Sequence, residues 1–148
     1  MSVPARNGLT VLELLLSLGI ILIMFGVSTP LLRSFLLRND LDVVQNSVTQ
    51  DMYRAENLAS SGEADSAWGI KILTGRVIVF SGNSYATRNT NLDEVYNLSN
   101  GVTVSGKDEY VFSKLTGFPV STGVTTLTNQ ANETRSLTVN SKGMIEEQ

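Results

Sequence analysis

A single carboxylate lies in the most apolar stretch of the chain. The 24 residues from Leu9 to Leu32 contain one ionisable side chain, that of Glu13. A charged side chain in an apolar membrane helix costs roughly 2.5 to 3.5 kcal/mol on insertion scales, so such a group is expected to have a partner. No lysine or arginine lies between Arg6 and Arg33, and the same helix therefore offers Glu13 no basic side chain.

Residue types that support catalysis or metal binding are scarce in this chain. It has no histidine and no cysteine, which removes Ser-His and Cys-His nucleophile pairs, thiolate metal ligands and disulfides. Two acidic pairs, Asp93-Glu94 and Asp108-Glu109, offer oxygen atoms but lack the alternating ligands of a recognised calcium loop. We therefore predict no metal site, no cofactor and no enzymatic activity.

The charge distribution argues against a nucleic-acid partner. The formal net charge is −3, and the basic residues are scattered along the sequence. After Lys114 the only basic residues are Arg135 and Lys142. A nucleic-acid interface needs basic residues gathered on one face, and the sequence shows no such gathering.

The apolar stretch predicts a long helix whose first part crosses a membrane. About 20 apolar residues in a helix span the hydrocarbon core, and residues 9–32 exceed this length. The apolar region of a secretory signal peptide is shorter, about 7 to 15 residues, and precedes a small-residue cleavage site that is missing here. Pro30 is expected to kink the helix near the membrane boundary.

The helix is predicted to continue as an amphipathic segment over residues 33–61. Apolar residues recur there at spacings of three or four, with polar residues between them. Gly62 supplies a stop, because glycine adopts the left-handed conformation that ends a helix without strain. The recurring apolar residues are Leu37, Leu41, Val44, Val48, Met52, Ala55 and Ala59.

From Gly62 the pattern changes to the period of two that is typical of strands, so residues 62–148 are predicted to form a small β-rich globular part. Thr74-Gly75 separates two alternating runs and predicts a β-hairpin in which Ile72 pairs with Val77 and Ile70 with Val79. The predicted core of this part is Trp68, Ile70, Ile72, Val77 and Val79.

Further strand candidates follow the hairpin, so the fold class is α+β, with one long helix before an antiparallel sheet of about five or six strands. The candidates are GVTVSG, EYVFSK, VTTLT and RSLTVN. Residues 83–100 are rich in Asn, Thr and Ser and are predicted to be mainly a connection, with a short extended piece near Tyr96. This connection and residues 130–135 are the expected recognition loops.

The amino-terminal residues resemble a known family. A short polar leader, residues 1–8, ends in Gly8 and precedes Leu9-Thr10-Val11-Leu12-Glu13 and an unbroken apolar run. This arrangement resembles the class III signal peptide of type IV pilins and type II secretion pseudopilins. The resemblance implies that prepilin peptidase cuts between Gly8 and Leu9, that Leu9 is then N-methylated, and that Glu13 is the family's glutamate at the fifth mature position, which pairs between subunits.

Two further positions bear on this resemblance. Pro30 occupies the mature position at which many pilins have a helix-kinking proline. The family usually has phenylalanine at the first mature position, where this chain has Leu9. The resemblance therefore implies cleavage more strongly than full methylation.

The carboxyl-terminal sequence is similar to that of the GspH/FimT-like group of minor pseudopilins. The stretch GVTTLTNQANETRSLTVNSKGMI has the strand, turn, strand and glycine-containing ending of that group. The matching points are Arg135, Leu137, Val139 and Gly143. The lack of a carboxyl-terminal cysteine pair, which major type IV pilins commonly have, favours the same group.

Three classes of function remain open at this point. The resemblance favours a structural subunit, a minor pilin or pseudopilin, of a type IV pilus, a competence pilus or a type II secretion pseudopilus. A stand-alone single-pass binding protein with a β-rich extracytoplasmic head explains the apolar helix but not Glu13. A membrane-anchored enzyme would have to work without histidine or cysteine.

The resemblance also implies where the chain resides and what it meets. It places the helix in the inner (cytoplasmic) membrane, with the globular part outside and later in a pilus or pseudopilus. The expected partners are other pilin or pseudopilin subunits, prepilin peptidase, the inner-membrane assembly machinery and membrane lipid. Arg33 and Arg38 follow the apolar run while Arg6 precedes it, so the local charge count does not favour an inward amino terminus.

Overall fold

The computed structural model of the protein describes the backbone of residues 10–148 and the side chains of residues 10–25 and 35–148. These residues form one long helix, eight strands and two short 3-10 helices. The chain divides into two compact units between Phe35 and Leu36. We call the second unit, Leu36–Gln148, the head, and describe each unit by itself.

The long helix, α1, spans Val11–Ser61. At its start the hydroxyl of Thr10 accepts a hydrogen bond from the backbone N–H of Glu13 at 3.3 Å. At its end Gly62 adopts a left-handed φ of 70° and donates its N–H to the carbonyl of Ala59, which satisfies one of the free carbonyls of the last turn. The helix therefore begins and ends close to the residues that the sequence pattern indicates.

Three predictions concern parts of the chain that the structure leaves undescribed. Gly8 and Leu9, the predicted cleavage and methylation sites, lie outside the described residues. Residue 30 is helical, but the side chain of Pro30 lies outside the described part, and the kink stays a prediction. Among the described residues, no helix has a segment long and apolar enough to cross a membrane.

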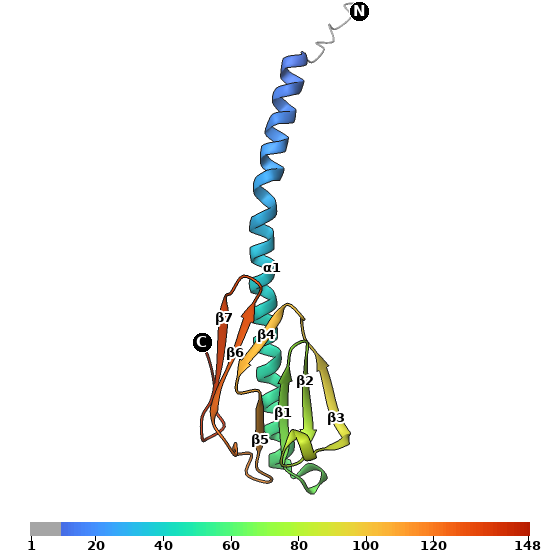
Figure 1. The fold of residues 1–148 in the computed structure, drawn as a ribbon, viewed down its shortest axis with the longest axis vertical. Helices are drawn as coiled ribbons and strands as arrows, with labels where there is room; N and C mark the ends of the chain where they lie inside the picture. Colours follow the sequence, from blue (N-terminus) through green and yellow to red (C-terminus); the bar gives the residue numbers. More distant parts are fainter. Residues whose placement is uncertain (1–9) are drawn as a thin grey trace, which may run out of the picture. The chain divides into compact units, whose positions relative to one another are not determined.

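The strands of the head form two four-stranded antiparallel sheets (Figure 1). The first sheet has the order β3 (Asn89–Asn97), β2 (Arg76–Ser81), β1 (Trp68–Leu73) and β5 (Glu109–Phe112). The second has the order β4 (Val102–Gly106), β6 (Gly123–Asn129), β7 (Thr134–Val139) and β8 (Ile145–Glu147). The 3-10 helices are η1 (Glu63–Asp65) and η2 (Tyr85–Thr87).

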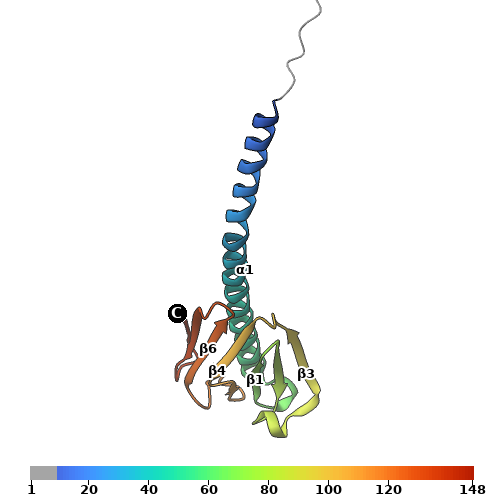
Figure 2. The same cartoon turned by 45° about the horizontal axis from the view of Figure 1, so that its top comes forward.

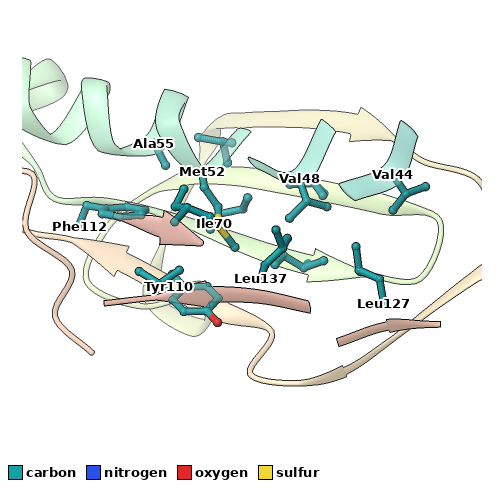
Figure 3. Close-up of a cluster of buried hydrophobic side chains, with 14 of the residues drawn as sticks. Val44, Val48, Met52, Ala55, Ile70, Tyr110, Phe112, Leu127 and Leu137 are labelled. Carbon is teal, nitrogen blue, oxygen red and sulfur yellow. The ribbon is translucent and has the colours of Figure 1, made fainter. Parts of the chain in front are cut away.

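One apolar stripe of α1 packs against both sheets, and Figure 2 shows the head portion of α1 alongside β1, β4 and β6. In Figure 3 the helical side chains point toward residues of β1, β5, β6 and β7. Six helical residues of this stripe are at most 2% exposed, which is the burial that their spacing of three or four predicts. They are Leu41, Val44, Val48, Met52, Ala55 and Ala59.

The first hairpin has the register that its alternating pattern indicates. β1 pairs with β2 so that Ile72 lies opposite Val77 and Ile70 lies opposite Val79. The turn between the strands contains Gly75, whose φ of 81° is unfavourable for any residue with a side chain. These four residues and Trp68 are all buried in the apolar cluster that also contains the helical stripe of α1.

A smaller apolar cluster lies on the other face of the first sheet. Ile78, Phe80 and Val111 are buried there, with Tyr85 of η2 packed against them. The rings of Phe80 and Tyr85 meet edge to face with centroids 5.7 Å apart. The guanidinium of Arg88 lies 3.8 Å from the centroid of the Tyr85 ring, so η2 covers this outer face.

The predicted strand inventory is wrong in two places. Most of residues 83–100 was expected to be a connection, yet residues 89–97 form the long strand β3. The carboxyl-terminal strand β8, residues 145–147, was not predicted at all. Both are strands at the end of a sheet, where only one neighbour pairs with them and a largely polar sequence suffices.

The close packing around Gly69 predicts a sharp stability effect. A Cβ at this position would lie 2.6 Å from Cζ of Phe80 and 2.7 Å from the carbonyl oxygen of Tyr110. Gly69→Ala should therefore lower the free energy of unfolding by about 1–3 kcal/mol, the usual cost of overpacking. Urea unfolding of the full chain in a non-ionic detergent, followed by the fluorescence of the single tryptophan, measures it.

Gly101→Ala is the matched control. The nearest atom to a Cβ at Gly101 would be 3.4 Å away, in ordinary contact. This variant should unfold within about 0.5 kcal/mol of the parent. Equal stability of the two variants would show that the sheet accommodates a methyl group at Gly69.

Candidate functional site

The amino-terminal half of α1 has an apolar surface that the described residues leave uncovered. Every large apolar side chain from Val11 to Phe25 is between 49% and 78% exposed. These residues lie on all faces of the helix rather than along one stripe. A helix that is apolar all round is normally buried in a bundle or a membrane, so this surface requires partners of its own.

Glu13 lies in the first turn of this exposed segment. Its backbone N–H donates to Thr10, and its carbonyl accepts a hydrogen bond from the hydroxyl of Ser17 at 2.7 Å. Among the side chains that the structure describes, those of residues 10–25 and 35–148, none forms an ion pair with its carboxylate. The carboxylate is thus available to a group from outside the described part of the chain.

Within the head, residues 38–49 of α1 make polar contacts with the second sheet and its β6–β7 turn. Arg38 pairs with Glu133 at 2.7 Å, and Arg135 pairs with Asp42 at 3.1 Å. The Thr49 hydroxyl donates to the carboxylate of Glu147 at 2.7 Å. Partly exposed contacts of this kind contribute little stability each, but together they fix where α1 lies on the sheet.

The turn between β6 and β7 is fixed on α1 by Asn129. The buried Asn129 amide donates to the carbonyl of Leu37 at 3.2 Å, and its oxygen accepts the N–H groups of Ala131 and Glu133. Residues 130–135, an expected recognition loop, are therefore held against the helix at both ends. Arg135, a basic residue named above, directs its guanidinium to Asp42 and to the Thr134 carbonyl.

An exposed apolar loop between β5 and β6 was missed from the sequence. Leu115, Phe118 and Val120 are 68%, 55% and 67% exposed. The loop is nevertheless tied to α1, because the N–H of Leu115 donates to the carbonyl of Ala59 at 2.8 Å. Leu115 itself has a positive φ of 68°. The signal available in the sequence was three large apolar residues within the stretch KLTGFPVSTG, where no strand pattern needs them.

A charged cluster joins α1 to β3. The Arg54 guanidinium binds Glu94 through Nε and through Nη2, the latter at 2.6 Å from Oε1. The Tyr96 hydroxyl also donates to Glu94, at 2.8 Å. The hydrogen bond from Arg54 lowers the pKa of Glu94 from its usual value.

Asp51, one turn before Arg54 on α1, is the unusual member of this region. Asp51 is 8% exposed, and its Oδ2 atom is buried with no hydrogen-bond partner among the described residues. Burial, followed by the nearby charge of Glu94, raises the pKa of Asp51 to about 6. The Asp51 carboxylate is therefore an unsatisfied buried charge at neutral pH.

The two acidic pairs considered for calcium are engaged in ion pairs. Asp93 binds Arg88 at 2.9 Å, while the Lys71 ammonium lies 2.9 Å from Asp108 and 3.6 Å from Glu109. In the described part of the chain no three acidic side chains gather in a way that could hold a metal ion.

The similarity of this chain to known proteins lies in its fold alone. The sequence matches no protein-family model and none of the curated proteins compared with it. The structure matches the minor pseudopilin EpsH from the type 2 secretion system of Vibrio cholerae with a TM-score of 0.55. The fold is similar to that of a minor pseudopilin. The match covers 74% of this chain and 96% of EpsH at 11% sequence identity.

The raised pKa of Asp51 predicts a pH-dependent stability. The folded state binds the proton more tightly than the unfolded chain does, because the pKa rises from 3.8 to about 6 on folding. The contribution of Asp51 to the free energy of unfolding should therefore fall as the pH rises from about 4 to about 6, and stay lower above that interval. Asp51→Asn should remove this loss and stabilise the head by about 1–2 kcal/mol at pH 7.5.

Asp40→Asn, an exposed substitution on the same helix, is the control. It should change the free energy of unfolding by less than about 0.5 kcal/mol at every pH. Urea unfolding at several pH values between 4 and 8 measures both variants. A parallel pH dependence of Asp51→Asn and the parent would show that Asp51 is not the titrating group.

Proposed function

We propose that the chain is a minor subunit of a pilin-like filament and that it polymerises through the amino-terminal half of α1. The observation that carries this proposal is the uncovered apolar surface of Val11–Phe25, joined in one chain to a well-packed head. The similarity of the fold to a minor pseudopilin supports it. Of the three filament systems considered, this similarity favours a type II secretion pseudopilus over a type IV or competence pilus.

The proposed assembly accounts for apolar residues on every side of the helix. In a filament, such helices pack together in a central bundle, and each helix contacts several neighbours. Before assembly, the same surface suits the hydrocarbon of the inner membrane, with residues 9–32 as a single span and the head extracytoplasmic. The partners in this proposal are other pilin or pseudopilin subunits, lipid, prepilin peptidase and the inner-membrane assembly machinery.

We assign the head a binding role rather than a catalytic one. The loop between β5 and β6 exposes the apolar side chains of Leu115, Phe118 and Val120 and is tied to α1 by a backbone hydrogen bond, which suits contact with another protein. The chain contains no histidine or cysteine for nucleophilic or general-base chemistry at neutral pH. In this proposal the head positions neighbouring subunits or an adaptor.

Processing by prepilin peptidase is the first consequence of the proposal. Gly8 has no side chain to obstruct a peptidase, so the mature chain should begin at Leu9 and carry an added methyl group on its amine. Intact-mass and amino-terminal peptide analysis of the protein from peptidase-active cells measures both. Recovery of only the form that begins at Met1 would contradict the proposal and favour a stand-alone anchored protein.

The second consequence concerns the partner of Glu13. After cleavage, the charged amine of Leu9 on one subunit is proposed to pair with the Glu13 carboxylate of its neighbour. Two unit charges about 4 Å apart attract by roughly 4 kcal/mol at an effective dielectric constant of 20, which is comparable with the cost of burying the carboxylate. The pair would select the axial register, while the apolar helices supply most of the affinity.

Glu13→Val should leave membrane insertion and cleavage intact but should reduce incorporation into filaments severely. Glu13→Gln should be milder, because the amide oxygen still accepts a hydrogen bond from the amine. Immunoblots of the precursor and mature forms measure cleavage, and recovery in sheared or cross-linked filaments measures incorporation. Incorporation of Glu13→Val at the parent level would exclude pairing between subunits and leave Glu13 a role at the membrane interface or in peptidase recognition.

A further inference from the structure

β3 has an outer edge that is open to another strand. It is the terminal strand of its sheet, and no strand within residues 10–148 pairs with its outer side. Leu98 N–H donates to the carbonyl of Gly75 at 2.9 Å, on the inner side. Because hydrogen bonding alternates along an antiparallel pair, the N–H and C=O groups of Val95 and Asn97 point away from β2.

The sequence of β3 does little to block such pairing. Natural edge strands are commonly protected by lysine, proline or a bulge. The segment Asn89–Asn97 contains no lysine, arginine or proline. Its pairing with β2 is irregular only in its first part, between Asn89 and Glu94. Its charged residues, Asp93 and Glu94, are both acidic. The edge is therefore open along residues 95–97 and is unfavourable only to an acidic segment.

A groove lies beside this edge, between β3 and α1. It is lined on the helix side by Ser47, Gln50 and Asp51, and on the strand side by residues 95–98. Glu94 and Tyr96 face the helix, because they contact Arg54 and the core that surrounds the helical stripe. An extended segment placed along β3 would continue the first sheet over this part of α1.

Asp51, which lines the same groove, has a buried acceptor atom. The neighbouring polar groups are committed elsewhere: Arg54 directs Nε and Nη2 to Glu94, and the Tyr96 hydroxyl donates to Glu94 as well. Oδ2 of Asp51 has no partner among the described residues. The charge of Glu94 adds to the negative charge near Asp51, and the cation of Arg54 offsets it less strongly. A donor that suits this position is therefore cationic.

We propose that this groove binds an extended segment of another polypeptide, which adds as a strand to the outer edge of β3 and directs a lysine or arginine to Asp51. Main-chain hydrogen bonds to Val95 and Asn97 would supply affinity for any extended segment. The basic side chain would supply the selectivity. This interaction goes beyond filament assembly by α1 and does not require it.

The test uses the full chain, labelled with ¹⁵N and held in a non-ionic detergent at pH 7.5. The probe is a synthetic heptapeptide of alternating threonine and valine with lysine at its centre, and the matched peptide has glutamine there. The lysine peptide should shift the amide resonances of Asp51, Val95 and Asn97. It should bind about tenfold more tightly than the glutamine peptide, in line with a hydrogen bond to a charged group.

Two variants test separately the addition of a strand to β3 and the selection of a basic side chain by Asp51. Asp51→Asn should bring the affinities of the two peptides to within about twofold of each other, because the charge that distinguishes them is removed. Val95→Pro should abolish binding of both peptides, because it removes an outward N–H without touching the β2 ladder. Should Val95→Pro unfold, slower hydrogen exchange of Val95 and Asn97 in the parent with bound peptide measures the same contact.

Three results would overturn the proposal. Absence of resonance shifts in the parent at millimolar lysine peptide would show that the edge does not accept a strand. Equal affinity of the lysine and glutamine peptides would show that Asp51 does not select a basic side chain. Shifts confined to residues away from β3 and α1 would place the binding elsewhere on the head.

Discussion

The head depends on a single stripe of α1 that two sheets share as their core. Val48 and Met52 are fully buried on the helix, with Ile70 from the first sheet and Leu137 from the second in the same cluster. A four-stranded sheet is apolar on the face that it must bury, and here each sheet buries that face against the same helix. Removing the stripe would therefore uncover both sheets at once, so the helix and the two sheets form one structural unit.

The parts of the fold that could be predicted are those with a local pattern. The buried helical stripe follows a spacing of three or four, and the first hairpin has period-two alternation on each side of a glycine turn. β3 could not be predicted in the same way, since Asn and Thr fill four of its six exposed positions. What holds it is tertiary: pairing with β2 and the contact between Arg54 and Glu94, residues 40 positions apart.

The residues of the candidate site likewise fall into those that a local sequence pattern reveals and those that only tertiary contacts reveal. The apolar surface around Glu13 is evident from composition alone, because almost every side chain in that stretch is apolar. Asp51 was harder to recognise, because its spacing of three residues from Val48 and four from Ala55 places it at the edge of the buried stripe, where a polar side chain ordinarily stays in contact with solvent. Its burial arises only when β3 lies along α1, and sequence separation hides that neighbour. Leu115 was hidden for a similar reason, since a left-handed backbone is not expected of leucine.

α1 thus carries two apolar surfaces with different requirements. Residues 41–59 present a stripe on one side, which the sheets of the same chain cover. Residues 11–25 present apolar side chains on all sides, which no single face of a sheet could cover. The head core includes none of these latter side chains. Folding of the head and burial of the first segment are therefore separate processes that use different residues of one helix, so changes in the first segment can alter assembly without destabilising the head.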